Sequence, residues 1–411
     1  MGAGRSLKIA VAGCGPAGLG AALFLARDGH DVTLFDRFEA PRPLGSGLMI
    51  QPTGLAVLDE LGLGGAIRAT GARVDRLFGK AAPSGRTVLD VRYAALGRQA
   101  GFGLGVHRAS LFDLLHAAVL SAGLPLCCNQ TINGSAPFAH GRRVLVLDAN
   151  RTAPFDLVVD ALGCNTPLAP PTGRTLAYGA LWASLDWPAG LAFDGHALEQ
   201  RYEAASTMVG VLPIGSVAGL ARPQAAFFWS LRCDRLEAWR AEGLESWKAR
   251  VATIWPETTS LLDQIVSPSQ LTFARYTHRT IKRPVGEALV HIGDSWHSTS
   301  PQLGQGANMA LLDAYALALA LRGAADVPTA LNDYVRLRQW HVRLYQTMSA
   351  AFTPVYQSDG RALPFIRDRL VGPLSRLWPA DWIQAAMVSG LVGGPLKPLG
   401  LEPATDFATL E

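Results

Sequence analysis

The sequence has few cysteines and none of the spacings that bind metals or form redox pairs. Its five cysteines, Cys14, Cys127, Cys128, Cys164 and Cys233, form no C-x-x-C pair. An odd number without regular spacing is typical of reduced thiols that bind no metal. We therefore expect a cytoplasmic protein without a metal site.

Charge is also scarce. Charged residues make up 17% of the 411 residues, and 37 Lys and Arg against 33 Asp and Glu leave a net charge of +4. No basic cluster stands out, whereas a nucleic-acid surface needs Lys and Arg concentrated on one face. The hydrophobic share of 49% excludes a disordered chain. The length predicts more than one domain, and we expect no nucleic-acid partner.

Long apolar runs of the kind that span membranes are missing as well. Residues 9–26 carry no charge and follow Arg5 and Lys8, as in a signal peptide. Pro16 and several glycines make this run a poor continuous helix. The uncharged run 382–396 is too short for a span. We expect no membrane span, and we find no internal repeats.

A glycine turn lies near the N-terminus between a predicted strand, 7–12, and a predicted helix, 19–27. Its sequence is Gly13-Cys14-Gly15-Pro16-Ala17-Gly18. Gly13 permits the tight turn, Gly15 lets a pyrophosphate approach the backbone, and Gly18 lets the helix pack closely on the strand. The free amides at the helix N-terminus then bind the anion.

A second predicted strand, 31–35, ends in Asp36, whose carboxylate can accept hydrogen bonds from a ribose diol. Strand, glycine turn, helix, strand and acid together predict a dinucleotide site. The alternative is a glycine turn without a ligand, with Asp36 as an ordinary surface carboxylate.

Another glycine loop follows in the second half of the chain. Residues 288–292 predict a strand that ends at Gly293-Asp294, and Gly304-Gln305-Gly306 then opens a long helix. The unpaired amides and partial positive charge of such a helix N-terminus suit a group that becomes negative during turnover. Asp294 either binds a cofactor or caps a turn, and we expect His297 to be a packed, hydrogen-bonded histidine.

These motifs together resemble the single-component FAD-dependent monooxygenases, the aromatic hydroxylase group. The resemblance runs from about residue 7 to 345. Residues 45–52 resemble the family's loop beside the flavin, and an arginine precedes a predicted helix as in the family. The matching positions are Gly13–Gly18, Asp36-Arg37, Arg108, Gly293-Asp294, Pro301 and Gly304–Asn308.

The resemblance implies an α/β fold in which a Rossmann-like FAD-binding domain is interleaved with a β-sheet substrate domain. The FAD-binding domain would comprise residues 1–77, 98–170 and 277–345, and the substrate domain residues 78–97 and 171–276. Residues 346–411, rich in proline, would form a C-terminal helical extension packed on the body as a lid or dimer contact.

The resemblance also implies which residues bind FAD. The ADP half and linking chain would be held by Gly13, Gly15, Pro16, Ala17, Gly18, Asp36, Arg37 and Arg108. Asp294 would bind the ribityl or pyrophosphate region. The isoalloxazine would lie along Gly47, Pro301, Gly304, Gln305, Gly306, Ala307 and Asn308. The helix that begins near Gly306 would stabilise the anionic reduced flavin.

The region between the two glycine loops has a different character. Residues 178–185, 204–212 and 225–232 predict strands, and residues 236–254 predict one amphipathic helix. This resembles the sheet that lies over the flavin in the family. Candidate substrate contacts are Tyr202, Trp229 and Tyr276, with Arg201 as an anion partner, although core aromatics and a surface arginine would give the same pattern.

In the family, NADPH or NADH reduces the flavin, O2 adds to it, and the C4a-hydroperoxide hydroxylates or epoxidises an aromatic or conjugated small molecule. No Ser-His-Asp set or H-E-x-x-H motif offers a competing chemistry, and no catalytic base can be named. The alternatives are a flavin oxidase or dehydrogenase on the same fold and a non-catalytic FAD-binding protein. We expect a monomer or homodimer.

One segment departs from the family. Where the family carries Gly-Ala-Asp-Gly, this sequence has Asp160-Ala161-Leu162-Gly163. Asp160 would face the same side of an extended strand as residue 162, but about 6–7 Å away along the chain. We therefore predict that FAD binding is retained while NAD(P)H use is altered or weakened. The alternative is that Asp160 only forms a turn.

Overall fold

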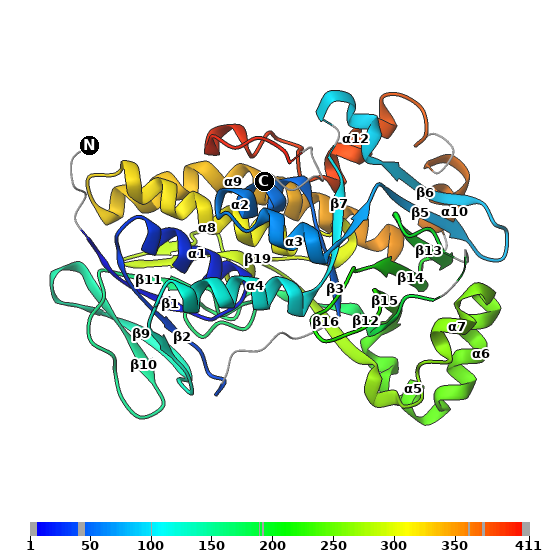
Figure 1. Ribbon diagram of the computed structural model, residues 1–411, viewed down its shortest axis with the longest axis horizontal. Coiled ribbons are helices and arrows are strands. Elements are labelled where there is room, and N and C mark those ends of the chain that lie inside the picture. The colour runs from blue at the N-terminus through cyan, green and yellow to red at the C-terminus, as the bar shows by residue number, and fades with distance from the viewer. Residues whose placement is uncertain are drawn as a thin grey trace.

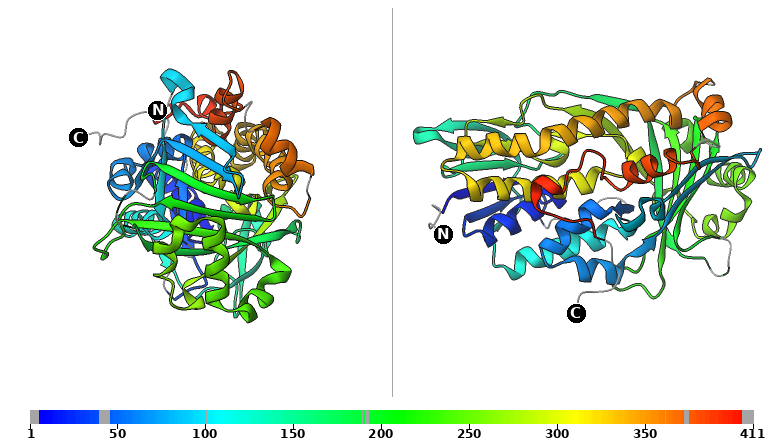
Figure 2. Two further views of the ribbon diagram at one scale, coloured as in Figure 1. Left: turned by 90° about the vertical axis from the view of Figure 1, so that its right-hand side faces the viewer. Right: turned by 90° about the horizontal axis from the view of Figure 1, so that it is seen from above.

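The computed structural model describes residues 6–39, 46–99, 101–188, 190, 193–360, 362–371 and 375–404. A mostly parallel sheet occupies one end of the long axis, and a larger, mostly antiparallel sheet occupies the other (Figures 1 and 2). The long helices α8 (Gly306–Gly323) and α9 (Val327–Tyr356) run along the molecule between the two ends.

The first sheet has six strands in the order β17-β18-β11-β1-β2-β8. All neighbours are parallel except the edge pair β17 and β18. Helices α1 and α8 cover one face of the sheet and the hairpin over residues 132–147 packs on the other, so the strands are nearly continuous apolar runs. The strands are β1 (Lys8–Ala12), β2 (Asp31–Phe35), β8 (Leu126–Cys127), β11 (Leu157–Asp160), β17 (Val285–Gly286) and β18 (Leu289–His291).

The second sheet has eight strands in the order β19-β16-β12-β15-β14-β13-β5-β6. Only β13 and β5 are parallel neighbours. The strands are β5 (Arg76–Ala81), β6 (Thr87–Arg92), β12 (Arg174–Asp186), β13 (Ala197–Glu203), β14 (Thr207–Pro213), β15 (Gln224–Arg232), β16 (Thr272–Thr280) and β19 (His297–Ser298).

One face of this sheet is covered by three helices, α5 (Leu236–Glu242), α6 (Leu244–Ile254) and α7 (Thr259–Leu262) (Figure 1). Leu181, Val211 and Phe227 point to that side and pack with Trp247 and Trp255 of the helical layer. Because side chains alternate along a strand, the neighbouring residues face the interior of the molecule.

Two smaller sheets and six further α-helices complete the described part of the fold. A three-stranded sheet consists of β3 (Gly47–Ile50), β7 (Gly103–His107) and β4 (Ala72–Val74), and β9 (Ile132–Phe138) pairs with β10 (Arg142–Leu147). The remaining helices are α1 (Pro16–Arg27), α2 (Pro52–Glu60), α3 (Gly64–Thr70), α4 (Arg108–Ser121), α10 (Ala362–Ile366) and α12 (Ala380–Val388).

The predicted fold class is confirmed: an α/β body, an antiparallel sheet inserted in sequence, and helices in the C-terminal extension. Residues 78–92 do join the sheet built by residues 174–280, while the domain limits themselves stay a prediction. Gly45 and Pro373, part of the predicted loop and of the proline-rich tail, lie outside the described residues. In the described ranges, no helix has both the length and the apolarity to cross a bilayer.

Two predicted elements were wrong in detail. The single helix over 236–254 is two helices, because Gly243 between them adopts a φ of 89° that breaks the helical hydrogen-bond pattern. The strand expected from residue 204 begins at Thr207, because Ala204 turns the chain with a φ of 52°.

Candidate functional site

A cavity of 1190 Å³ extends from the carboxyl ends of the parallel strands to the inner face of the eight-stranded sheet. This exceeds the roughly 300–1,000 Å³ of a site for one drug-sized ligand. One part of the cavity is lined by the β1–α1 turn, the end of β2, the start of α4 and the segment between β18 and α8. We call this part the loop half. The part lined by the eight-stranded sheet, the end of α9 and α12 is the sheet half.

The three glycines of the first turn have different surroundings. A Cβ on Gly13, whose φ is 102°, would lie 2.6 Å from the Ala161 carbonyl oxygen, and one on Gly18 would lie 1.9 Å from the Gly13 oxygen. These two positions require glycine for close packing. At Gly15 nothing lies within 4 Å of the Cβ position, and the residue lines the cavity. The backbone there is open to a ligand.

Helix α1 begins beside this opening without a side-chain N-cap, with Pro16 in its first turn and Ala17 lining the cavity. Asp36 also lines the cavity and accepts hydrogen bonds from the Cys14 N–H at 2.9 Å and the Phe38 N–H at 3.1 Å. A carboxylate has about four lone-pair sites, so Asp36 keeps acceptor capacity for a diol. Burial, reinforced by the Asp36 charge, raises the pKa of the Cys14 thiol, which stays protonated.

The second glycine loop lies across the cavity from the first turn. Asp294, Pro301 and Gly304–Ala307 line it, and α8 begins at Gly306 without a side-chain cap. The Gln302 Nε2 and Gln305 Oε1 atoms in this segment are buried and have no hydrogen-bond partner. The Asp294 side chain is exposed to the cavity, and desolvation by the surrounding cavity wall raises its pKa, although His297 and Arg108 act in the opposite direction. The loop therefore presents the uncapped start of α8 to the cavity.

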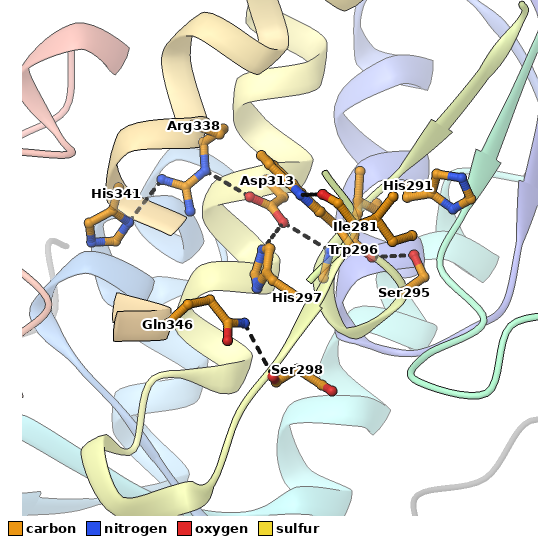
Figure 3. Close-up of polar contacts among 12 residues, drawn as sticks. Ile281, His291, Ser295, Trp296, His297, Ser298, Asp313, Arg338, His341 and Gln346 are labelled. Atoms are coloured by element: carbon orange, nitrogen blue, oxygen red, sulfur yellow. Dashed lines mark hydrogen bonds and ion pairs between the residues drawn. The ribbon is translucent and has the colours of Figure 1, made fainter. Parts of the chain in front are cut away.

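A buried ion pair supports this loop from behind (Figure 3). The Asp313 carboxylate on α8 accepts hydrogen bonds from the Gly293 N–H at 2.9 Å, His297 Nε2 at 2.7 Å and Arg338 Nε at 2.7 Å. Although burial opposes its ionisation, His297 and Arg338 lower the pKa of Asp313 through charge and hydrogen bonding. His297 is a packed, hydrogen-bonded histidine, and that prediction is confirmed.

The same network reaches the C-terminal extension. Arg338 Nη1 donates to His341 Nδ1 at 3.1 Å, and His341 Nε2 donates to the Gly390 carbonyl oxygen at 3.2 Å. Burial and the Arg338 charge lower the pKa of His341, which is neutral and can both accept and donate. The chain of contacts thus connects the loop, α8, α9 and the segment after α12.

Asp160 does not take the place of the missing family aspartate. Its buried carboxylate accepts hydrogen bonds from the Leu162 N–H at 3.0 Å, the Thr166 hydroxyl at 2.7 Å and His291 Nδ1 at 2.6 Å. It is not among the cavity residues, whereas Leu162 is. Asp160 forms the turn and fixes the end of β11 to β18, in agreement with the alternative that it only forms a turn.

Gly47 and Asn308, both predicted to lie along the isoalloxazine, have different surroundings. Gly47 lines the cavity, where a Cβ would lie 2.6 Å from Ala226 Cβ. Asn308 is fully buried, accepts from the Gln51 N–H at 2.8 Å and donates to the Met49 oxygen at 3.2 Å. The side-chain amide of Asn308 thus joins the segment after β3 to α8, and its place along the ligand stays a prediction.

The sheet half contains only two of the four predicted substrate residues. Tyr202 and Tyr276 line the cavity, and the Trp182 Nε1–H donates to the Tyr276 hydroxyl at 2.9 Å. Trp229 packs in the helical layer on the opposite face of the sheet, and the Arg201 guanidinium lies 4.3 Å from the Trp255 ring there. Arg201 and Trp229 do not line the cavity, because each faces the other side of its strand.

Sequence reasoning missed several residues of the sheet half. Trp182, Met208 and Phe228 line it; alternation along β12, β14 and β15 puts them on one face of the sheet but does not show that this face lines the cavity. Gln357, which follows α9, also lines the cavity, and nothing in its sequence context indicated this.

The loop half fits a dinucleotide such as FAD. It combines an open glycine backbone, an acid at the end of β2, and two uncapped helix starts. Arg37 and Arg108 also line it and supply positive charge. Among the described residues, no cluster of His, Cys, Asp and Glu is arranged to hold a metal ion, and all five cysteines are free.

Relatives of named activity are similar to the chain over most of its length. The 3-amino-4-hydroxybenzoate 2-monooxygenase of Streptomyces cremeus is 26% identical over 81% of this chain and 84% of that protein. The 3-hydroxybenzoate 6-hydroxylase 1 of Aquipseudomonas alcaligenes is 26% identical over 92% of this chain and 95% of that protein.

Solved structures share the fold. The structure of Klebsiella pneumoniae HpxO complexed with FAD and uric acid has a TM-score of 0.79 and 20% identity and covers 95% of this chain and 98% of that chain. A family model described as FAD binding domain matches residues 6–107 and 193–346, which is more than half of the chain. The chain therefore belongs to this FAD binding domain family, and it is an FAD-dependent monooxygenase.

Proposed function

We propose that this monooxygenase hydroxylates or epoxidises an aromatic or conjugated small molecule with O2 and with NADPH or NADH as the reductant. The proposal rests on the sheet half of the cavity, which is lined by aromatic side chains and is continuous with the loop at the start of α8. A cofactor in the loop half would leave this compartment for a second ligand.

FAD would be held along the loop half. Gly13, Gly15 and the start of α1 would hold the pyrophosphate, with Asp36 at the ribose, while Arg37 and Arg108 would provide positive charge. Asp294 would bind the linking chain, and residues 301–307 would lie along the ring. When bound, FAD supplies the electron transfer and the reaction with O2 that a monooxygenase needs.

In the proposed reaction, the protein positions the substrate and excludes water from the cavity. Trp182, Phe228 and Tyr276 form an apolar wall that can hold a flat ring against the start of α8. Burial raises the pKa of Tyr276 to about 12, so its phenol is neutral at pH 7 and is a hydrogen-bond donor or acceptor there. No side chain of the sheet half is assigned as a catalytic base.

The reductant is expected to bind weakly. Leu162, an apolar side chain, lines the cavity at the position where the family has an acid, and Asp160 is occupied by its three donors. We propose that reduction by NAD(P)H is slow or poorly saturable for this reason. We further propose a cytoplasmic monomer or homodimer.

The test is isotopic. The FAD-loaded protein is incubated with NADPH or NADH, 18O2 and a panel of phenols and heteroaromatic compounds, and the products are analysed by mass spectrometry. One 18O atom per product molecule supports the proposal. Hydrogen peroxide without labelled product would instead indicate an oxidase. Bound FAD that no reductant or substrate can reduce would indicate a non-catalytic FAD-binding protein.

A further inference from the structure

The C-terminal extension carries many exposed apolar side chains close together in the sequence. Of the twelve large apolar side chains that are exposed in the described part of the chain, seven lie between residues 363 and 383. Trp378 is 82% exposed. Monomeric proteins rarely expose such a cluster unless it binds another surface. We call these seven side chains the C-terminal patch: Leu363, Phe365, Ile366, Leu377, Trp378, Trp382 and Ile383.

The elements that carry the C-terminal patch lie side by side. Helix α10 packs on residues 367–371, and both those residues and α12 contact the edge strand β6. The ribbon views place α10 and α12 at the same end of the molecule, next to β6 (Figures 1 and 2). The exposed side chains of the two helices therefore belong to one region of the surface.

Helix α12 is also part of the cavity wall. Ala380, Ile383, Gln384 and Met387 line the sheet half, and Ile383 belongs to the C-terminal patch as well. No side chain in the described lining of the sheet half is charged. Any surface that covers the C-terminal patch would therefore lie next to an uncharged, mostly apolar compartment.

Arginines border the C-terminal patch. Arg76, Arg92 and Arg376 all pair with the carboxylate of Asp90, at 2.6, 3.3 and 3.4 Å. Asp90 is buried, whereas at least half of the Arg92 and Arg376 side chains is exposed. One carboxylate cannot neutralise three guanidinium groups, so positive charge remains on the surface directly before Leu377.

A further arginine lies within the C-terminal patch itself. The guanidinium of the exposed Arg369 lies 4.3 Å from the centre of the Phe365 ring. Residues 363–383 contain two acids, and one of them, Asp368, pairs with the buried Arg367 at 2.8 Å. The other, Asp381, does not balance Arg369 together with the surplus beside β6. The region therefore combines exposed aromatic side chains with net positive charge.

This combination fits the surface of an anionic lipid bilayer. Trp side chains favour the headgroup region because they are apolar with one polar edge, and exposed arginines are attracted to anionic headgroups. A second copy of the chain is a poorer partner. In a twofold interface the same surface meets itself, so the surplus positive charges of the two copies would repel each other.

We propose that the C-terminal patch docks the protein on an anionic lipid bilayer. Phe365, Trp378 and Trp382 would enter the headgroup region, while Arg369 and Arg376 would lie against lipid phosphates. The protein would rest on the bilayer without crossing it, and α12 would bring the sheet half close to apolar molecules dissolved there. The inference goes beyond the proposed function and does not depend on it.

The experiment measures how much of the FAD-loaded full chain floats with lipid vesicles in a density gradient. Vesicles of phosphatidylcholine alone are compared with vesicles in which about a third of the lipid is phosphatidylglycerol, at about 0.1 M NaCl. We expect the partition coefficient to be about tenfold higher with the anionic lipid. Most of this gain should be lost at about 1 M NaCl, where charges are screened within about 3 Å.

Variants then assign the binding to the C-terminal patch. Phe365→Ser should weaken binding to the anionic vesicles about tenfold, and Trp382→Ser serves if that variant fails to fold. Arg369→Gln should weaken it about fivefold and leave binding to phosphatidylcholine unchanged. Phe138→Ser is the matched control, because Phe138 is exposed to 47% against 55% for Phe365 and also lies under an arginine, Arg142. It lies on β9, at the other end of the molecule, and its variant should bind as the native protein does (Figure 1).

The outcomes separate docking from catalysis and from self-association. Equal binding to the two kinds of vesicle, or equal loss in the Phe365 and Phe138 variants, would overturn the inference. A native chain that floats with neither vesicle would also overturn it, and a dimer seen by light scattering that Phe365→Ser abolishes would then assign the C-terminal patch to a second copy. Docking that depends on the C-terminal patch supports the inference even if no 18O-labelled product forms, while labelled product without docking supports the proposed function alone.

Discussion

The two halves of the cavity are built by different means. The loop half uses backbone turns and two helix starts from two short segments, 13–18 and 293–307, together with four charged side chains, of which only Asp294 lies in these segments. The sheet half uses side chains from strands and helices spread over residues 77–388 and holds no charge in its described lining. The cofactor side of the cavity is therefore built mainly from short contiguous segments of the chain, whereas the substrate side depends on how distant strands and helices pack together.

The largest expected effect concerns the ion pair behind the loop half. Replacing Asp313 with Asn leaves the Arg338 guanidinium buried without a counter-charge, and we expect the free energy of unfolding to fall by about 3–5 kcal/mol. Chemical denaturation of the two proteins measures the difference. Asp333→Asn removes an exposed pair with Arg336 on α9 and should cost less than about 1 kcal/mol.

The Asp313 contribution also has a predicted pH dependence. Because its pKa in the folded protein is lower than the ordinary value of 3.8, the contribution is present at neutral pH and is lost as the pH falls through the lowered value. The stability difference between native protein and Asp313→Asn should therefore persist down to about pH 4 and shrink below it. A variant as stable as the native protein at pH 7 would contradict the role of the ion pair.

The next effect tests the open backbone of the loop half. Gly15→Val places a side chain where nothing lies within 4 Å, so the fold should be retained while access to the helix start is blocked. We expect the Kd for FAD to rise about a hundredfold, which corresponds to about 2.7 kcal/mol. Titration of the cofactor-free protein with FAD measures it.

The matched control for Gly15→Val lies outside the cavity. Gly286→Val is also an uncrowded position, in β17, and should leave FAD binding unchanged. Equal affinity of the Gly15 variant and the native protein would show that the pyrophosphate does not approach this turn.

A smaller effect concerns the electron source. Leu162→Asp restores an acid at the cavity wall, and we expect the rate of flavin reduction by NADPH to rise about tenfold, equivalent to about 1.4 kcal/mol. Rapid-mixing absorbance at the flavin band measures the rate. Leu162→Asn has the same shape without charge and should stay near the native rate. Fast, saturable reduction of the native protein would mean that Leu162 does not impair the use of NADPH.

The smallest expected effect concerns side chains on the two opposite faces of the eight-stranded sheet. Tyr276→Leu removes an aromatic wall of the sheet half and should raise KM about fivefold, the equivalent of about 1 kcal/mol. Arg201→Leu changes a side chain on the helical face and should leave KM unchanged. A larger KM change for Arg201 than for Tyr276 would reverse the assignment of the two faces.

The loop half could be predicted from the sequence because each of its parts is a short contiguous pattern. Gly13, Gly18 and Asp36 occupy their expected places, since the tight turn and close helix packing act between near neighbours in the chain. The side-chain contacts of Asn308, by contrast, could not be predicted. Its amide is used by Gln51 and Met49, which are more than 250 positions away, and no local signal indicates such a partner.

For the sheet half, the sequence predicted strands but not which of their residues line the cavity. The strands 178–185 and 225–232 were recognised, but which alternate residues face the cavity depends on which face the helices α5–α7 cover. Tyr202 lines the cavity and its neighbour Arg201 does not, because adjacent residues on a strand face opposite sides. That Gln357 lines the cavity could not be predicted, since its position depends on where α9 ends relative to the cavity.

The most direct test of this account is an experimental structure of the protein with FAD bound. We expect the ADP half of FAD to lie along Gly13–Gly15 and Asp36, and its isoalloxazine ring to lie along residues 301–307. In that position the ring would leave Tyr202, Tyr276 and Gln357 uncovered for a substrate. A ring that fills the sheet half, or an ADP half bound away from the first glycine turn, would contradict it.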